Sequence, residues 1–299
     1  MNITNKSILH IGECMIEMSP IENGEFKSGF AGDTFNTAWY ARRALSSDWI
    51  VGYFTAVGDD HWSSEMLKFF ARSGVDQKHI IKIKGASPGL YIVRLDQGER
   101  SFSYWRSASA ARHLMNDRAA MRDALQGQGA VFFSGITLAI LEPSLRDAFL
   151  SEIAQARKDG SIIVFDPNLR PHLWESADVM RKVINQAGNH ADIVLPSFDD
   201  EQAHFGDRSP HETLKRYGSS TVVVVKNAGG EIVARDKTAD DFSFKPERIE
   251  NPIDTTAAGD AFNAGFLTTY LSTGNLANSV EDGAALAGKV ITQLGALVE

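Results

Sequence analysis

A short stretch near the end of the chain combines a carboxylate with residues too small to shield it. The sequence DTTAAGDAFNAGF, residues 254–266, places Ala257, Ala258 and Gly259 directly before Asp260. Small residues let the backbone approach a ligand closely, and the N–H groups of a helix start attract an anion. A carboxylate there is well placed to take a proton from a hydroxyl that attacks a phosphoryl group. An ordinary helix N-cap in a small-residue turn is the alternative interpretation of so short a pattern.

Apolar runs alternate with amphipathic segments along most of the chain and predict the elements that position this stretch. Strands are expected at residues 7–18, 49–58, 130–136, 161–168, 192–197 and 220–227, and helices at 35–45, 64–74 and 144–160. We expect Asp33 or Thr34 to cap the first helix and a left-handed Gly74 to end the second. Repetition of strand and helix predicts an α/β fold whose parallel sheet carries helices on both faces. Such sheets bind ligands beyond the carboxyl ends of their strands.

Two segments break the alternation. Residues 15–31 and 86–106 have the pattern of β-hairpins, the second around the turn DQGER. We interpret them as a small β-sheet at one edge of a single domain that spans residues 1–299. A flap of this kind can act as a lid that excludes water from a reaction.

Composition excludes several classes of function. The chain has 299 residues and a formal net charge of −8, which argues against a nucleic-acid-binding surface. Its single cysteine, Cys14, cannot form a disulfide within the chain or a cysteine-based zinc site. No apolar run approaches the ~18 residues of a membrane span, and no signal peptide is visible. We therefore expect a cytoplasmic protein that acts on small molecules without a membrane partner.

Two motifs carry a resemblance to a known family. The stretch at 254–266 resembles the C-terminal signature of the ribokinase (PfkB) family of carbohydrate kinases. The sequence GFAGDTFNTAWYARR, residues 29–43, resembles its N-terminal signature, with Gly32, Asp33 and Asn36 in place. The resemblance covers essentially the whole chain. It implies a ribokinase-like three-layer αβα sandwich with a mostly parallel central sheet and a β-sheet lid.

The resemblance assigns roles to individual residues. Asp260 resembles the catalytic base, and the amides of Ala257, Ala258 and Gly259 resemble the anion hole for the transferred phosphoryl group. The implied ATP-binding residues are Asn168, Arg170, Ser197, Lys226, Asn227, Gly229, Gly230 and Gly259.

Metal binding is implied at two places. Asp254 and Thr256 resemble the start of a loop that holds a monovalent cation such as K⁺ in many family members. The family's Asn-x-x-Glu magnesium motif appears only in altered form, because LPSFDDE puts Ser197 and Asp200 at its two positions. Binding of Mg²⁺ through water at Asp200 would tolerate this departure.

The substrate is read from other segments. Residues 11–18, 88–111, 132–141 and 165–174 resemble the 2-keto-3-deoxygluconate kinases of the family, which phosphorylate a sugar that carries a carboxylate. Arginine suits a carboxylate because it donates two parallel hydrogen bonds. The implied substrate-binding residues are Gly32, Asp33, Asn36, Tyr91, Tyr104, Arg106, Arg170 and Asp260. By strand alternation, Tyr104 and Arg106 share one face.

Alternatives remain open at this point. Without the resemblance, Tyr104 and Arg106 are better read as sheet packing and a solvated charge, and His172 as structural. The protein could phosphorylate a neutral sugar such as fructose or ribose, prefer the galactonate epimer, or sense a sugar without catalysis. A dehydrogenase is disfavoured because no Gly-x-Gly-x-x-Gly follows the first strand. The resemblance also implies a homo-oligomer, a dimer or higher, formed through the lid sheet.

Overall fold

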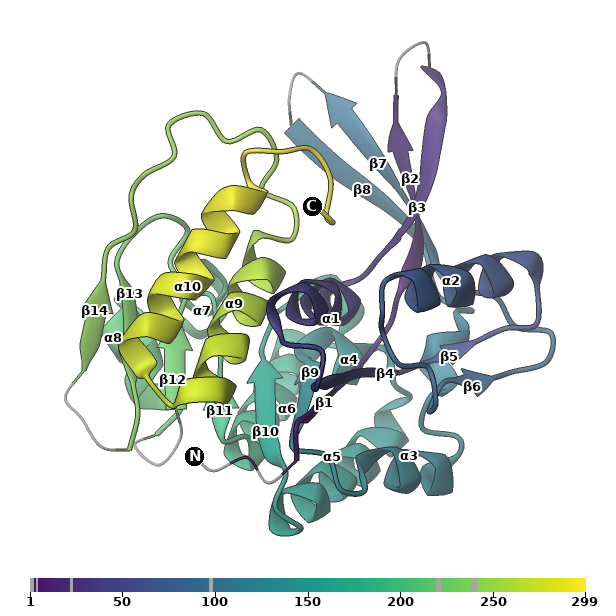
Figure 1. Cartoon of the computed structure of the whole chain (residues 1–299), viewed down its shortest axis with the longest axis horizontal. Helices are drawn as coiled ribbons and strands as arrows, with labels where there is room; N and C mark the ends of the chain where they lie inside the picture. Colours follow the sequence, from purple (N-terminus) through teal and green to yellow (C-terminus); the bar gives the residue numbers. More distant parts are fainter. Residues whose placement is uncertain (1–2, 4, 22–23, 97–98, 219–221, 238–240) are drawn as a thin grey trace.

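The computed structural model describes residues 3, 5–21, 24–96, 99–218, 222–237 and 241–299 (Figure 1). Its main sheet has eight strands in the order β14-β13-β12-β11-β10-β9-β1-β4. Neighbouring strands from β12 to β4 are parallel, whereas β13 and β14 are antiparallel. The strands are β1 Ser7–Ile11, β4 Ile50–Phe54, β9 Ala130–Ser134, β10 Ile162–Asp166, β11 Ile193–Val194, β12 Val222–Val225, β13 Ile232–Arg235 and β14 Phe242–Phe244.

Helices cover both faces of this sheet. Consecutive strand residues point to opposite faces, so Ile8 joins one hydrophobic core and Leu9 the other. The first core is closed by α1 Asp33–Ala44, α2 His61–Arg72, α9 Ala258–Thr273 and α10 Leu276–Val290. The second is closed by α3 Arg118–Leu125, α4 Gly135–Ile140, α5 Pro143–Lys158, α6 Ala177–His190 and α8 Pro210–Arg216. The predicted α/β fold with a helix-covered parallel sheet is confirmed.

Shorter elements complete the chain. They are α7 Phe198–Phe205, the 3₁₀ turns η2 Ala110–His113 and η3 Pro171–Leu173, and a pair of two-residue strands, β5 Ala56–Val57 and β6 Ile81–Lys82. None of the helices in the described ranges is long and apolar enough to cross a membrane.

A second sheet extends away from the main one, beyond α1 (Figure 1). Its order is β3-β2-β7-β8, with antiparallel hairpins β2–β3 and β7–β8 joined by the parallel pair β2–β7. The strands are β2 Met15–Pro20, β3 Phe26–Ala31, β7 Leu90–Asp96 and β8 Glu99–Trp105. They fall within the segments 15–31 and 86–106, although the turn at 97–98 lies outside the described residues. We refer to these four strands as the lid sheet.

The predictions of single strands at 7–18 and 49–58 are wrong. Residues 7–18 divide into β1 of the main sheet and β2 of the lid sheet, and residues 49–58 divide into β4 and β5. Each apolar run continues across its break, because residues on both sides of the break are buried. Hydrophobicity alone therefore carries no sign that the chain changes sheets.

The start of α1 also differs from expectation. Gly32, and not Asp33 or Thr34, is the N-cap, and Asp33 is the first helical residue. A Cβ at Gly32 would lie 2.1 Å from the carbonyl oxygen of Glu13, so no larger side chain fits between the two segments. The expected left-handed Gly74, with φ of 72°, follows α2.

Replacement of Gly32 tests this close approach. Gly32→Ala is expected to lower the free energy of unfolding by about 1–3 kcal/mol, because the new methyl group meets fixed backbone. Gly29→Ala on the same lid hairpin is the matched control, since its Cβ would find its nearest neighbour only at 4.0 Å. Chemical denaturation of both variants measures the difference. Equal stabilities would show that the backbone around Gly32 yields freely.

Candidate active site

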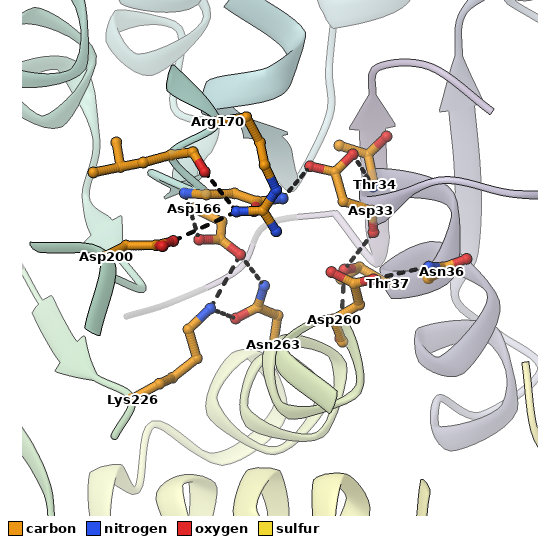
Figure 2. Close-up of polar contacts among 12 residues, drawn as sticks. Asp33, Thr34, Asn36, Thr37, Asp166, Arg170, Asp200, Lys226, Asp260 and Asn263 are labelled. Atoms are coloured by element: carbon orange, nitrogen blue, oxygen red, sulfur yellow. Dashed lines mark hydrogen bonds and ion pairs between the residues drawn. The ribbon is translucent and has the colours of Figure 1, made fainter. Parts of the chain in front are cut away.

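The carboxyl edge of the main sheet holds a closed triangle of polar side chains (Figure 2). Asp166 ends β10, Lys226 follows β12, and Asn263 lies on α9. One oxygen of Asp166 accepts from Lys226 Nζ at 3.0 Å and from Asn263 Nδ2 at 2.6 Å. Lys226 Nζ also donates to Asn263 Oδ1 at 2.9 Å. All three side chains are buried, so the triangle fixes α9 against the ends of two strands.

Asp260 lies one helical turn before Asn263, at the start of α9. Its Oδ2 accepts a hydrogen bond from Asn36 Nδ2 of α1 at 2.8 Å. The side chain keeps some exposure to solvent, yet the surrounding protein raises its pKa to about 7. Burial is the main cause, and the nearby charge of Asp33 adds to it. A carboxyl group with this pKa can accept a proton near neutral pH.

Asp33 faces the same region from the first turn of α1 (Figure 2). Its carboxylate accepts the backbone N–H of Thr34 at 2.8 Å and Nδ2 of Asn168 at 2.7 Å. Burial raises the pKa of Asp33 as well. Asn168 adopts a left-handed backbone with φ of 33°, which asparagine tolerates better than most residues. Asn168 therefore contacts a residue expected at the sugar side of the site.

The stretch before Asp260 forms a helix start beside a cation. Ala257 is left-handed with φ of 60° and caps α9, which begins at Ala258. The Ala258 N–H makes a long bond of 3.3 Å to the carbonyl of Thr255. A Cβ at Gly259 would lie 3.8 Å from Lys226 Nζ. The helix dipole and the ammonium group together favour an anion at this position.

A cavity of about 1160 Å³ opens on the other side of this helix start. This volume exceeds the roughly 300–1,000 Å³ of typical ligand sites, so the cavity is large enough to hold a nucleotide. Among the predicted ATP-binding residues, those that line it are Ser197, Lys226, Asn227, Gly229, Gly230 and Gly259. Asn168 and Arg170 do not line it. Gly229 is left-handed, with φ of 83°, which explains the need for glycine there.

Arg170 and Asp200 face each other near Asp166 (Figure 2). Arg170 Nη1 lies 3.6 Å from an oxygen of Asp200. Such a long, partly exposed pair contributes little to stability, and Arg170 Nη1 also donates to the Leu169 carbonyl at 2.5 Å. Burial raises the pKa of Asp200, which follows Ser197, the N-cap of α7.

The two predicted metal positions differ. Asp254 is buried, and its carboxylate accepts N–H groups from Thr256 at 3.0 Å and Gly295 at 2.7 Å. Within the described part of the chain, no three His, Cys, Asp or Glu side chains are arranged to hold a metal ion. Asp200, on α7, instead lies 3.6 Å from Arg170.

The lid residues Tyr104 and Arg106 form a second group of contacts, together with His172. Tyr104 stacks on His172, with ring centroids 6.1 Å apart, and the guanidinium carbon of Arg106 lies 5.9 Å from the Tyr104 ring. Burial lowers the pKa of His172, and the charges of Arg106 and Arg170 lower it further. Both arginines thus act electrostatically on one imidazole.

Tyr91 lies deeper than expected. It is buried in a small core with other lid residues, and its hydroxyl donates to Glu17. Arg106, just after β8, forms an ion pair with Glu13. Neither carboxylate was expected from the sequence.

Sequence reasoning missed Asp166, Asn263, Glu13, Glu17 and the position of His172. Two signals could have found the first pair. Asp166 directly ends an apolar strand run, where ligand-facing side chains gather. Asn263 follows Asp260 by three residues, and this spacing puts both on one helix face.

Comparison with known proteins identifies the family. The chain matches the pfkB family carbohydrate kinase over residues 5–298. The chain belongs to this family. The 2-dehydro-3-deoxygluconokinase of Haemophilus influenzae is 38% identical, with 98% of this chain and 96% of the relative covered. The enzyme of the same name from Escherichia coli K12 is 36% identical, with 98% and 97% covered.

Solved structures of the family share the fold. The 2-dehydro-3-deoxygluconokinase of Thermotoga maritima has a TM-score of 0.83 at 17% identity, with 98% of this chain and 96% of the other covered. The fructokinase with bound ATP from Xylella fastidiosa has a TM-score of 0.81 at 24% identity, with 98% and 94% covered. The ribokinase-like architecture and the family predicted from the two signatures are confirmed.

The buried triangle yields a stability prediction. Lys226→Met should cost about 3–5 kcal/mol of unfolding free energy, because Asp166 then keeps a buried charge without a cation. The double variant Asp166→Asn with Lys226→Met should recover much of this loss, since no charge remains. Urea denaturation of the three proteins measures both effects. A double variant that is less stable than the single one would contradict the electrostatic explanation.

Proposed function

We propose that this pfkB family kinase transfers the γ-phosphoryl group of ATP to the 6-hydroxyl of 2-keto-3-deoxygluconate. This sugar acid is the 2-dehydro-3-deoxygluconate that appears in the relatives' names. Those relatives are 35–38% identical to this chain over nearly its full length. One observation carries the proposal most directly. A carboxyl group with a pKa of about 7, Asp260, stands beside a helix start built from small residues.

Asp260 accepts the proton of the attacking hydroxyl. A bond forms between this oxygen and the γ-phosphorus while the bond to the bridging oxygen breaks, and ADP leaves. Asn36 holds the Asp260 carboxylate in place through its amide. The N–H groups of Ala257, Ala258 and Gly259, with Lys226 nearby, stabilise negative charge on the transferred group.

ATP occupies the cavity lined by Ser197 and the loop from Lys226 to Gly230. Asp200 would hold Mg²⁺ through water, and the ion would neutralise charge on the triphosphate. Arg170 stands between donor and acceptor and balances charge during transfer. A monovalent cation near Asp254 and Thr256 would support the loop that presents the helix start.

The sugar lies under the lid sheet against Gly32, Asp33 and Asn36. Arg106 lies beside the Tyr104 ring and His172 stacks on it, while the charges of Arg106 and Arg170 both reach His172. The two arginines can form charge-assisted hydrogen bonds with the sugar carboxylate that a neutral sugar cannot accept, so the subsite favours an acid.

The pKa of Asp260 predicts the pH dependence of catalysis. Below about pH 7 the carboxyl holds a proton and cannot act as a base, so kcat/KM should rise with pH through about 7. Asp260→Asn should lose this dependence and lower kcat by ~10²–10⁴ with little change in either KM. Steady-state kinetics across pH measure both.

The same substitution controls for folding. The pKa of Asp260 lies above its unfolded value of 3.8, so this group favours the fold at low pH and loses that contribution as pH rises through about 7. Asp260→Asn should therefore be at least as stable as the wild type above that pH. Wild-type turnover by the variant would remove Asp260 from the role of base.

A panel of sugars tests the substrate. ADP release should be fastest with 2-keto-3-deoxygluconate and much slower with fructose or ribose. The panel also includes the epimeric acid, 2-keto-3-deoxygalactonate. Asp260→Asn, purified in parallel, accounts for contaminating kinases. Faster release with a neutral sugar would overturn the proposed substrate, and no release with any sugar would favour a sugar-sensing role.

A further inference from the structure

One residue lies at the base of the whole lid sheet. Glu13 stands between β1 and β2, where the chain leaves the main sheet. A Cβ at Gly32, after β3, would lie 2.1 Å from the Glu13 carbonyl oxygen, and a Cβ at Gly89, before β7, would lie 2.8 Å from Glu13 Oε1. Arg106, after β8, forms an ion pair with Glu13 Oε2. Glu13 thus contacts the root of every lid strand.

The ion pair is buried and only partly formed. The side chain of Glu13 is 1% exposed and that of Arg106 is 10% exposed. Glu13 Oε1 and Arg106 Nε are buried without hydrogen-bond partners in the described structure. A carboxylate and a guanidinium can share two parallel hydrogen bonds, and a small rotation would satisfy both atoms. A second hydrogen bond, from Arg106 Nε to Glu13 Oε1, would strengthen this ion pair.

We propose that Glu13 is a positioning residue that holds the Arg106 guanidinium for recognition of the sugar carboxylate. The inference rests on the proposed function, because it deepens the substrate specificity of the same site. Arg106 carries several N–H donors, and Glu13 occupies only part of them. An acidic ligand near Tyr104 would bind to the donors that Glu13 does not occupy.

Without Glu13, another carboxylate near Tyr104 would compete for the Arg106 guanidinium. Asp33 also carries a carboxylate whose charge reaches Tyr104, and a long, mobile arginine would be drawn to it. An arginine held in advance loses less conformational entropy when the substrate binds. Glu13 supplies the counter-charge from below the lid, away from the reacting groups.

Kinetics of three variants test the proposal. Glu13→Gln should raise the KM for 2-keto-3-deoxygluconate about tenfold, as expected for loss of a charge-assisted hydrogen bond. The KM for ATP and kcat should change less than about twofold on the same grounds. Glu13→Asp keeps the charge and should restore part of the sugar affinity. Glu152→Gln breaks another pairing of a buried carboxylate with arginines, at 2.7 and 2.9 Å, and should leave both KM values unchanged.

A double-mutant cycle separates positioning from general stability. Arg106→Ala should raise the sugar KM more than Glu13→Gln does. If Glu13 acts through Arg106, then Glu13→Gln added to Arg106→Ala should cause no further loss of sugar affinity. Thermal unfolding of each protein checks that it remains folded under assay conditions.

The outcomes are distinct. Additive losses in the cycle, an equal rise in the KM values of sugar and ATP, or an unchanged sugar KM would each overturn the role of Glu13 while the wild type stays active on the acid. A wild-type enzyme that ignores the acid would overturn the proposed substrate, and this inference with it.

Discussion

The pairing of one buried cation, Lys226, with one of several neighbouring carboxylates controls the chemistry of this site. Asp33, Asp166 and Asp260 gather near the carboxyl edge of the main sheet (Figure 2). Lys226 forms an ion pair with Asp166, whereas Asp260 accepts a hydrogen bond from the neutral amide of Asn36. Asp166 serves as a structural anchor. Burial and the neighbouring charge of Asp33 raise the pKa of Asp260 into the range of a useful base.

The same anchor determines the geometry of the phosphoryl site. Asn263 and Asp260 share α9, so the bonds that fix Asn263 to Asp166 also fix the start of that helix. The Lys226 ammonium lies beside Gly259 and adds charge where the helix dipole is already positive. The proposed base and the proposed anion site are therefore held by the same buried contacts, as electrostatic catalysis requires.

The lid sheet is joined to this arrangement at more than its base. Ala296, close to the C-terminal end, packs in a small core with Met15, Ala31, Tyr91 and Val93 of the lid. The Tyr40 hydroxyl of α1 donates to the Ala296 carbonyl at 2.8 Å and accepts the Val298 N–H at 3.1 Å. The end of the chain thus contacts both the lid sheet and α1.

The elements of the fold were predictable where their patterns were local. Alternating apolar runs located most strands, and the two hairpins of the lid sheet were recognised from period-two segments. The breaks after β1 and β4 were not predictable, because a buried residue looks the same in either sheet. Gly32 was recognised as part of a motif, but its steric reason appeared only with the Glu13 carbonyl beside it.

By itself the sequence determined the family and the α/β class, and it predicted which short stretch carries the base and the anion site. These depend on residue types at close spacing, which are visible along a linear chain. Tertiary structure alone decided which partner each charge receives. Glu13 and Arg106 are 93 positions apart, and Asn36 and Asp260 are 224 apart. Partners so distant are chosen by packing, and packing sets both the pKa of Asp260 and the orientation of Arg106.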